Sequence, residues 1–326
     1  MTNKCVAIGI IGAGIMGERL IGAILQQDPE LVRACGVWDP SPEAMRRMEK
    51  TFPAVPRMTD AAAVIAASDC VYVASPPASH LGHARAALAA GKSFFGEKPL
   101  SIDVADARAF VSEAGNRGAV NFPFASSFAV AALRDWIAKG EIGTPRRIDI
   151  EVGFKAWPRP WQADAVAWLD KPQQGGFTRE VVSHFLFLAR RLAGPLHDLS
   201  GEAWFPEAGT SERRIAATLR AGELPVTLAG AVGGTAKDDH NVWMLEGDRC
   251  AVRLCDWSIA ERRLPDGTWQ PAPDAMPNER ARPLALKRQL EGVTNLARGK
   301  AHHLATLEEA LDVQEIVEAI LATRST

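Results

Sequence analysis

A glycine-rich turn near the start of the chain has the spacing that binds a dinucleotide. Between an apolar strand-like run and a helical stretch stands the segment Gly12-Ala13-Gly14-Ile15-Met16-Gly17. Gly12 would permit a tight bend, Gly14 would let the backbone approach a pyrophosphate, and Gly17 would let the helix pack closely on the strand. The helix N-terminus would offer free N–H donors and a positive dipole end to the phosphates. The turn, Ile15 and Met16 included, therefore predicts a dinucleotide site, and a glycine turn without a ligand is the alternative.

A carboxylate follows at the distance at which a ribose is bound. Asp39 ends the second strand-like run, about 20 residues after Gly17. It would accept hydrogen bonds from the adenosine ribose hydroxyls and repel a 2′-phosphate, and no arginine or lysine is adjacent to it in the sequence. We therefore expect NAD, with NADP less favoured. The alternative is that Asp39 caps the helix that opens at Ser41-Pro42, a role that Ser41 could also fill.

Two polar clusters follow later strand-like runs of the same half. Ser75 and Pro76, with His80 shortly after, come behind the third run, and Glu97-Lys98-Pro99 comes behind the fourth. Ligands of open α/β sheets bind beyond the carboxyl ends of the strands, so both clusters lie where a site is expected. A strand ending in Glu-Lys-Pro behind an N-terminal GxGxxG turn resembles the Gfo/Idh/MocA family of glucose-fructose oxidoreductase, inositol dehydrogenase and MocA.

The resemblance covers nearly the whole chain and implies roles for these residues. Lys98 would lie near the nicotinamide and the substrate hydroxyl, where an ammonium stabilises negative charge on the reacting oxygen. Glu97 would hold the loop or touch the cofactor, and Ser75, Pro76 and His80 would lie beside the cofactor. For Lys98, a lysine that only extends along the surface before a helix is the alternative.

A second segment of the resemblance ends at His184. It reads Gly175-Gly176-Phe177-Thr178-Arg179-Glu180-Val181-Val182-Ser183-His184 and is similar to the family's Gly-Gly-Gly-x-x-Asp-x-x-x-His. Glu180 and His184 are four residues apart, which puts them on one face of a helix. The resemblance implies that His184 is the general base in oxidation or the acid in reduction, since an unperturbed imidazole titrates near neutral pH. Glu180 would orient His184 or bind a neighbouring substrate hydroxyl.

Two positions depart from the family's pattern. Glu180 stands where the family usually has Asp, so the charge is kept but lies one methylene farther out. The segment Asn121-Phe122-Pro123-Phe124-Ala125 lacks an arginine that many members carry, so a substrate contact must come from elsewhere or be absent. An ordinary surface contact between Glu180 and His184 is one alternative. A metal site is another, but no third ligand stands at a suitable spacing, and we expect no metal.

Three tryptophans gather in the proline-broken segment before the glycine pair: Trp157, Trp161 and Trp168. Such a segment could form a lid over the substrate, with Trp161 stacking on a ring and Arg159 or Lys155 binding hydroxyls or a carboxylate. Packing of the loop itself, or of a subunit interface, is an equal alternative.

The elements that must position these residues follow from the apolar pattern. Up to residue 122, short β-branched runs such as Val6 to Ile11 alternate with alanine-rich helical stretches such as Val104 to Ala114. That rhythm predicts an α/β Rossmann domain with a doubly wound parallel sheet. Beyond it, longer alternating runs such as Arg146 to Phe154 predict an α+β domain with a large, mainly antiparallel open sheet.

Three parts of the chain follow from this pattern. We expect a dinucleotide-binding domain over 1–122, a substrate-binding and dimerisation domain over 123–299, and a C-terminal helix within 300–326 that packs back on the first domain. The segment Thr306-Leu307-Glu308-Glu309 predicts the start of that helix as a capping box.

Composition narrows the class of protein. The chain has 326 residues, 47% of them apolar, which is enough for two domains. Its 37 basic and 39 acidic side chains give a net charge of −2 without a run of like charges, which disfavours nucleic-acid and membrane-surface binding. The longest apolar stretch, Cys5 to Met16, is too short to span a bilayer. Five irregularly spaced cysteines indicate reduced thiols and a cytoplasmic protein.

Together, the residues and the resemblance predict an NAD-dependent oxidoreductase. It would move hydride between nicotinamide and a secondary alcohol or ketone of a sugar, cyclitol or related small polyol. A homodimer or homotetramer is expected, because the open sheet face of the family commonly forms dimers. Two other functions stay open: a glycosidase or lyase that uses tightly held NAD transiently, and a non-catalytic relative that senses a dinucleotide.

Overall fold

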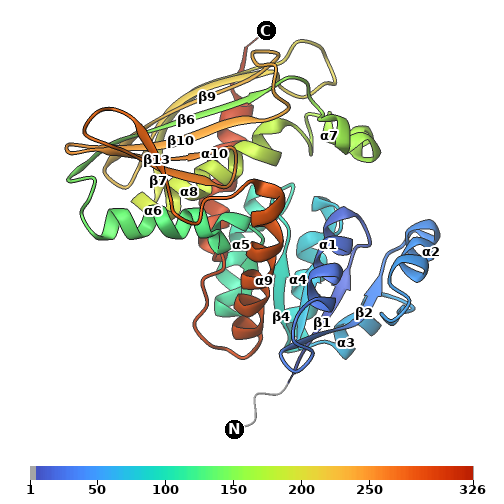
Figure 1. Cartoon of the computed structure of the whole chain (residues 1–326). Coiled ribbons are helices and arrows are strands. Elements are labelled where there is room, and N and C mark those ends of the chain that lie inside the picture. Colours follow the sequence, from blue (N-terminus) through green and yellow to red (C-terminus); the bar gives the residue numbers. More distant parts are fainter. Residues whose placement is uncertain (1–4, 326) are drawn as a thin grey trace. The chain divides into compact units, whose positions relative to one another are not determined.

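The short apolar runs of the first part of the chain form a five-stranded parallel sheet in the order β2-β1-β3-β4-β5. The computed structural model describes the backbone of residues 5–325 and the side chains of that range except those of 163–167 and 325. Figure 1 labels most of the elements that build this first unit: β1 (Val6–Ile11), α1 (Ile15–Leu25), β2 (Val32–Trp38), α2 (Pro42–Thr51), α3 (Ala61–Ala67), β3 (Cys70–Val73), α4 (His80–Ala89), β4 (Ser93–Gly96), α5 (Val104–Ala114), β5 (Gly118–Val120) and α9 (Asn278–Ala297).

Helices cover both faces of this parallel sheet. On one face, Ile10 of β1 packs in a buried core with Leu20 of α1 and Val293 of α9. On the other face, Gly9 of β1 lets α3 approach, since a Cβ at Gly9 would lie 2.6 Å from Val64 Cγ1. Each aliphatic side chain in such a core stabilises the fold by about 1.5 to 3 kcal/mol. The result is a three-layer doubly wound unit whose strands are buried on both faces.

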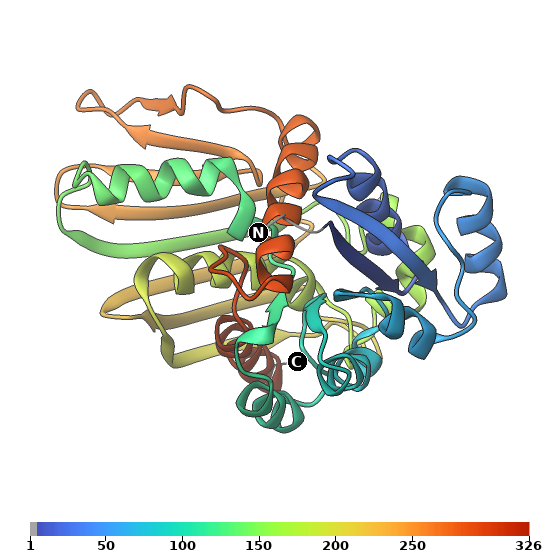
Figure 2. The same ribbon diagram turned by 90° about the horizontal axis from the view of Figure 1, so that it is seen from below.

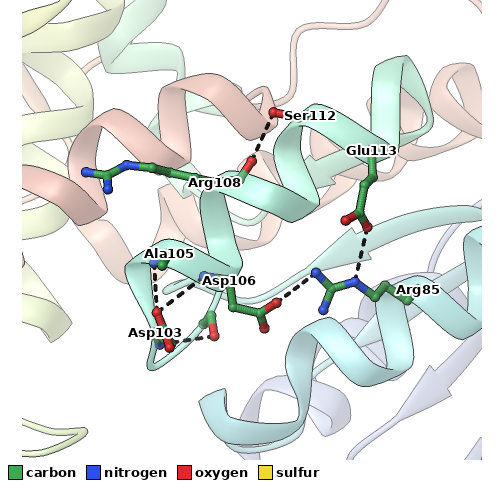
Figure 3. A network of polar contacts seen from close by, with 8 residues as sticks. Arg85, Asp103, Ala105, Asp106, Arg108, Ser112 and Glu113 are labelled. Atoms are coloured by element: carbon green, nitrogen blue, oxygen red, sulfur yellow. Dashed lines mark hydrogen bonds and ion pairs between the residues drawn. The ribbon is translucent and has the colours of Figure 1, made fainter.

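Polar contacts join α4 and α5 at the surface (Figure 3). Arg85 of α4 donates to Asp106 at 2.8 Å and to Glu113 at 3.3 Å, both on α5. Asp103 caps α5 by accepting from the backbone N–H groups of Ala105 and Asp106 at 2.7 and 3.3 Å. Exposed ion pairs contribute at most about 1 kcal/mol, and so does a typical cap. These contacts hold α5 beside α4, the helix that begins with His80.

The longer alternating runs form a nine-stranded sheet in the order β13-β12-β11-β10-β6-β9-β8-β7-β14. Its neighbours are antiparallel except for the pairs β6 with β9 and β7 with β14. The elements of this second unit are α6 (Phe128–Ala138), β6 (Pro145–Phe154), α7 (Val166–Leu169), a π turn (Thr178–Val182), α8 (Ser183–Ala193), β7 (Leu196–Trp204), β8 (Arg214–Ala221), β9 (Leu224–Val232), β10 (His240–Gly247), β11 (Ala251–Cys255), β12 (Ile259–Arg263), β13 (Trp269–Pro271) and β14 (Arg324–Ser325).

One face of this sheet is covered and the other is open. Along β8, buried and exposed side chains alternate, so that Ile215 and Leu219 lie in the core while Ala216 and Thr218 are exposed. The covered face packs against α6 and α8, the green and yellow-green helices that lie over the strands in Figure 2. The alternation of two residues per repeat is what a half-covered antiparallel sheet requires.

Both units take up segments from the end of the chain. The first comprises residues up to Ser126 together with Pro283–Leu311, and the second comprises Ser127–Arg282 together with the residues from Asp312 onward. Helix α10 (Leu307–Ala322) therefore begins in one unit and ends in the other. At its start the predicted capping box forms, because Thr306 N–H donates to Glu309 and Glu309 N–H donates to Thr306, at 2.9 and 3.2 Å.

The predicted fold class is confirmed by both sheets. The division at 122 and 299, with its division of roles, stays a prediction. All five cysteines are free thiols, and of these Cys35 and Cys70 are buried. Within residues 5–325, no helix is both long enough and apolar enough to cross a membrane.

Candidate functional site

Each of the three glycines in the glycine turn is required for a different physical reason. Gly12 has φ +105°, and a Cβ there would lie 2.5 Å from the carbonyl carbon of Ala74. A Cβ at Gly17 would lie 2.1 Å from Gly12 O, so Gly17 lets α1 meet the turn. A Cβ at Gly14 would have no heavy atom within 4 Å among the described residues. The backbone beside Gly14 is therefore open, at the helix N-terminus where phosphate would bind.

Gly14 is also the residue that precedes α1 at its N-cap position, and it has no side chain to cap the helix. Ile15 and Met16 form the first turn of α1, and Ile15 is exposed. The first N–H groups of a helix have no partner within the helix, so a ligand phosphate can accept from them.

Asp39 lies where β2 ends and joins the glycine turn to α2. Its Oδ2 accepts from Ala13 N–H and its Oδ1 from Ser41 N–H, both at 2.8 Å. A carboxylate has about four acceptor positions, so about two remain for ribose hydroxyls. The alternative cap role falls to Ser41, whose Oγ accepts from Ala44 N–H at 3.2 Å at the start of α2.

A cavity of about 440 Å³ adjoins this carboxylate. Its wall includes Trp38, Asp39, Met45, Arg46 and Arg57. Neither arginine was predicted, because neither is adjacent to Asp39 in the sequence; the folding of α2 and of the loop behind it brings both to the wall of this cavity. Arg57 pairs with Glu49 at 2.9 Å.

His80 joins the two polar loops at the carboxyl edge of the parallel sheet. Its Nδ1 lies 2.7 Å from Pro99 O and its Nε2 lies 2.7 Å from Ser75 O. Burial lowers the pKa of His80 below its usual value, while the two carbonyl acceptors act in the opposite direction. The imidazole therefore fixes the distance between the Ser75-Pro76 loop and the loop that holds Lys98.

Glu97 is anchored in a buried network under that loop. One carboxylate oxygen, Oε1, accepts from the Tyr72 hydroxyl and, at 2.6 Å, from Asn121 Nδ2. Gln289 of α9 completes the network by donating to Asn121 Oδ1 at 2.6 Å. Burial raises the pKa of Tyr72 well above its usual value. The network fixes Glu97, and the half-buried Lys98 follows it directly.

Asn121 answers one question that the sequence raised. The segment from 121 to 125 lacks an arginine. Its first residue, Asn121, is hydrogen-bonded between Glu97 and Gln289. Asn121 carries no charge, and both ends of its side-chain amide are hydrogen-bonded within this network.

The helix predicted to carry Glu180 and His184 begins as a π turn over Thr178–Val182 and continues as α8. Half-buried Glu180 lies in the π turn, and His184, with 8% of its surface exposed, lies in the first turn of α8. π turns inside α-helices are rare and occur often at functional sites. The turn widens the helix between the two side chains that were predicted to do chemistry.

Arg179 secures the π turn to α10. Its Nε and Nη2 donate to the two oxygens of Glu318, each at 2.6 Å. Its Nη1 donates to the carbonyls of Pro172 and Gly175 at 2.9 and 2.8 Å. A two-bonded Arg–carboxylate pair is geometrically specific, so it holds the helix start in one place.

Trp257 contacts the predicted site residue His184, and the sequence analysis did not indicate this contact. Its ring lies edge-on to His184, with centroids 5.4 Å apart, and tilted against Phe185 at 5.3 Å. Trp257 and the preceding Asp256 have φ of +75° and +43°. Left-handed backbone at non-glycine residues costs about 1 to 3 kcal/mol each and clusters at functional sites. No local sequence signal announces this turn, because its conformation depends on neighbours from other strands.

Arg159 and Trp161 lie together in the segment before the glycine pair. Arg159 is buried and its Nη1 donates to both oxygens of Asp239 at 3.0 and 3.1 Å. Its guanidinium lies 4.7 Å from the ring centroid of Trp161, which is 49% exposed. Burial raises the pKa of Asp239 above its usual value. The geometry makes Arg159 a support for Trp161, and Trp161 the side chain that faces solvent.

The predicted residues thus fall into two groups. The first unit brings together the glycine turn, Asp39, the Ser75-Pro76 loop with His80, and Glu97 with Lys98. The second holds Glu180, His184, Arg159 and Trp161. In the described part of the chain, no cluster of three or more His, Cys, Asp or Glu side chains could hold a metal ion.

Comparison with known proteins identifies both halves. The model of the GFO/IDH/MocA oxidoreductase family with an NAD-binding Rossmann fold matches residues 6–123. The model of the GFO/IDH/MocA C-terminal domain matches residues 130–249.

Two curated relatives match part of the chain. A 1,5-anhydro-D-fructose reductase of Ensifer adhaerens is 34% identical over 113 residues, 33% of this chain and 32% of the relative. An inositol 2-dehydrogenase of Cereibacter sphaeroides is 38% identical over 114 residues, 34% of this chain and 33% of the relative. The chain therefore aligns with about a third of the length of these relatives.

Solved structures share the fold over nearly the full chain. An oxidoreductase of Agrobacterium radiobacter, in complex with NAD+, L-tartaric acid and magnesium, superposes with a TM-score of 0.81 at 18% identity, covering 98% of this chain and 96% of that one. The WlbA dehydrogenase of Bordetella pertussis, in complex with NADH and UDP-GlcNAcA, superposes with a TM-score of 0.79 at 20% identity, covering 99% and 96%. At these identities the likeness establishes the fold alone.

Proposed function

This chain belongs to the Gfo/Idh/MocA oxidoreductase family, and from that premise we propose that it is an NAD-dependent oxidoreductase of a small polyol. Its substrate would be a secondary alcohol or ketone of a sugar, a cyclitol or a related compound. The observation that carries the proposal is the open glycine turn at the N-terminus of α1, with Asp39 bonded to Ala13 of that turn. The names of the curated relatives, an anhydro-sugar reductase and an inositol dehydrogenase, support the substrate class.

The residues of the first unit fit a nicotinamide dinucleotide. Gly14 leaves room beside the backbone, and Asp39 has acceptor positions left for ribose hydroxyls. Bound NAD would supply the hydride acceptor for the reaction. We assign its binding to the turn, to Asp39 and to the two loops at the carboxyl edge: Gly12, Gly14, Ile15, Met16, Gly17, Asp39, Ser75, Pro76, His80, Glu97 and Lys98.

Three side chains would do the rest of the chemistry. The Lys98 ammonium stabilises negative charge on the reacting substrate oxygen. An imidazole nitrogen of His184 accepts the hydroxyl proton in oxidation and returns it in reduction. Glu180 binds a neighbouring hydroxyl or orients His184 from the π turn. Because Glu180 is one methylene longer than the family's usual Asp, the hydroxyl it binds lies farther from the helix backbone.

Substrate contact in the second unit would fall to Trp161. Its exposed ring offers an apolar face on which the C–H face of a sugar or cyclitol ring can stack. Arg159 supports that ring from behind while it is paired with Asp239. That Arg159 itself binds substrate hydroxyls stays a prediction.

A titration and a substrate panel test the function. NADH and NADPH are titrated by nicotinamide fluorescence, and we expect micromolar NADH binding with NADPH at least about tenfold weaker, a gap of about 1.4 kcal/mol. Inositols, 1,5-anhydro-D-fructose and simple hexoses are then screened by nicotinamide absorbance. Failure of both nucleotides to bind would contradict the proposal. Turnover of a glycoside without net change in absorbance would instead favour transient use of the cofactor.

We also propose a homodimer or homotetramer in a reducing, cytoplasmic compartment. The free state of all five cysteines supports such a compartment, because extracellular proteins usually oxidise theirs. The open face of the nine-stranded sheet supports the oligomer. Across β8 and β9 it presents small side chains in register, with Ala216 opposite Ala229 and Thr218 opposite Thr227.

A further inference from the structure

Glu212 is a fully buried carboxylate that none of the proposed roles uses. It lies two residues before β8 and has no exposed surface. Its Oε1 accepts from Thr178 N–H at 2.7 Å, at the first residue of the π turn. Among the described residues, its Oε2 has no hydrogen-bond partner.

Of the two glycines before the π turn, Gly176 leaves the space that this carboxylate occupies. Gly176 has φ +101°, and a Cβ there would lie 2.3 Å from Glu212 Oε2 and 2.7 Å from Oε1. A Cβ at Gly175 would lie 2.0 Å from Leu169 O, so the neighbouring glycine meets backbone instead. Glu180 N–H donates to Gly176 O at 3.1 Å. The backbone that touches Glu212 is thus bonded directly to the residue predicted to bind substrate.

The segment that carries Glu212 is itself held on both sides. Asp170 accepts from Ser211 Oγ at 2.6 Å and from Arg213 Nη2 at 3.0 Å. Arg213 Nη1 also donates to Ser211 O at 3.0 Å. Glu212 therefore projects from a rigid base, and its carboxylate can fix the turn above it.

The burial of an ionisable side chain at position 212 costs free energy, so its presence calls for an explanation. Burial raises the pKa of the Glu212 carboxyl above its usual range, because the charged form loses its hydration. An apolar or amide side chain of similar size would fill the same space at a lower cost. The bond to Thr178 is a specific feature that an apolar side chain would not provide.

We propose that Glu212 is a positioning residue of the active site. Its buried carboxylate accepts from Thr178, holds the Gly176–Thr178 junction and so sets the π turn from which Glu180 and then His184 extend. The inference rests on the proposed function, because Glu180 and His184 are the groups whose placement it controls.

A matched pair of variants separates the effect of the hydrogen bond between Glu212 and Thr178 from the effect of the Glu212 charge. Glu212→Gln keeps an acceptor oxygen at the same reach and removes the charge, whereas Glu212→Asp keeps the charge and is one methylene too short to reach Thr178. Hydrogen exchange of the peptide over residues 176–184, followed by mass spectrometry of the full-length apoprotein, reports the bond directly. We expect exchange about tenfold faster in Glu212→Asp and close to wild type in Glu212→Gln.

Kinetics with myo-inositol, or with whichever compound of the panel the wild type turns over, supply the second readout. We expect kcat of Glu212→Asp to fall about tenfold or more, with NADH affinity unchanged and with activity rescued in Glu212→Gln. Asp60→Ala is the control, since Asp60 Oδ1 accepts from Ala63 N–H at the same 2.7 Å at the start of α3. It removes an equivalent helix-start bond remote from residues 176–184 in the sequence and should leave both readouts unchanged.

The outcomes distinguish this inference from the function on which it rests. Normal exchange and turnover in Glu212→Asp would overturn it. So would a loss in Glu212→Gln as large as that in Glu212→Asp, which would point to packing, or a larger one, which would point to charge, in place of the bond. If the wild type binds no nicotinamide and turns over no compound, the proposed function fails. In that case the exchange data still decide whether Glu212 sets the turn.

Discussion

Asp39 shares its carboxylate between the backbone and a cavity that also contains Arg46. Its negative charge opposes the 2′-phosphate of NADPH, while the arginine would attract it. We expect Asp39→Asn to tighten NADPH binding about tenfold relative to NADH, and the double variant with Arg46→Ala to lose that gain. Parallel fluorescence titrations measure both. An Asp39→Asn protein that binds NADPH as weakly as wild type would show that shape, and not charge, selects the cofactor.

Lys98 is the residue whose loss should separate chemistry from cofactor binding. Lys98→Ala removes the cation that we propose beside the reacting oxygen, so kcat should fall about 100-fold or more. NADH affinity should remain near that of wild type. Steady-state kinetics and nucleotide titration give the two values. Lys139→Ala is the control, because Lys139 is an exposed lysine paired with Asp135 on α6. Near-normal turnover in Lys98→Ala would remove Lys98 from the mechanism.

The buried Glu212 also makes a prediction about pH. Because its pKa is raised in the folded protein, the folded state holds the proton more tightly than the unfolded chain does. The stability that the carboxyl contributes is therefore fully present below its unfolded pKa of about 4.3 and is lost as pH rises through the folded pKa. Glutamine does not titrate. The free energy of unfolding of wild type minus that of Glu212→Gln should accordingly fall from pH 4 towards neutral in urea titrations, whereas a constant difference would contradict the shift.

Individual site residues differ in how far the sequence could predict them. Gly12, Asp39 and the Glu-Lys-Pro strand end could be predicted as candidates because a short motif fixes both their residue types and their place in a βα unit, and their roles stay predictions. Arg159 was assigned to substrate, and the structure shows it buried against Asp239, a partner 80 residues away. Trp257 gave no signal, because its contact with His184 joins a strand turn to a helix. Contacts between residues so far apart in the chain cannot be predicted from the local spacing of residue types.

At the scale of elements, the glycine turn provides a contrast between two neighbouring positions. Gly12→Ala would force a Cβ into the backbone of Ala74 at a φ of +105°, and should destabilise the fold by about 2 kcal/mol or more. Gly14→Ala meets open space and an ordinary φ of −82°, so folding should be unaffected. Its methyl group would occupy the approach to the pyrophosphate, and NADH affinity should fall about tenfold.

Thermal unfolding and NADH titration of the two variants check this contrast. Each variant is the control for the other, since the same methyl group is added two residues apart. Wild-type NADH affinity in Gly14→Ala would show that no phosphate approaches the backbone there.

The elements that the sequence predicted well are those with a clear period and an end signal. The strand Val6–Ile11 and the helix Val104–Ala114 have the predicted bounds, and the helix Leu307–Ala322 begins directly after Thr306, as the capping box predicted. Strand β7 was missed because its side chains are mostly exposed or half-buried, so no two-residue alternation marks it. The π turn was predicted as ordinary helix, since its wider hydrogen bonding depends on contacts around Thr178 made by residues from elsewhere in the chain.

At the scale of the whole molecule, the open sheet face predicts the assembly state. Ala229 lies exposed in the middle of that face, opposite Ala216. Ala229→Arg would place a charge on each copy at the expected interface, where like charges repel and long side chains prevent close packing. We expect wild type to sediment as a dimer or tetramer and the variant as a monomer. Ser112→Arg, on the outer surface of α5, serves as control, and a variant that still assembles would place the interface elsewhere.

Because the first unit includes Pro283–Leu311, its core cannot be completed until nearly the whole chain has been synthesised. The core of the parallel unit includes Leu290, Val293, Leu296 and Leu304, which come from a segment translated long after the fifth strand. At typical rates of synthesis, the nascent parallel sheet waits on the order of ten seconds for the helix that covers it. During that interval α1 and α2 alone pack on the aliphatic face of β1, and the part of the core that α9 completes is exposed to solvent. A chain stopped at residue 126 would therefore be a substrate for chaperones and an aggregation hazard, although it contains every strand of its sheet.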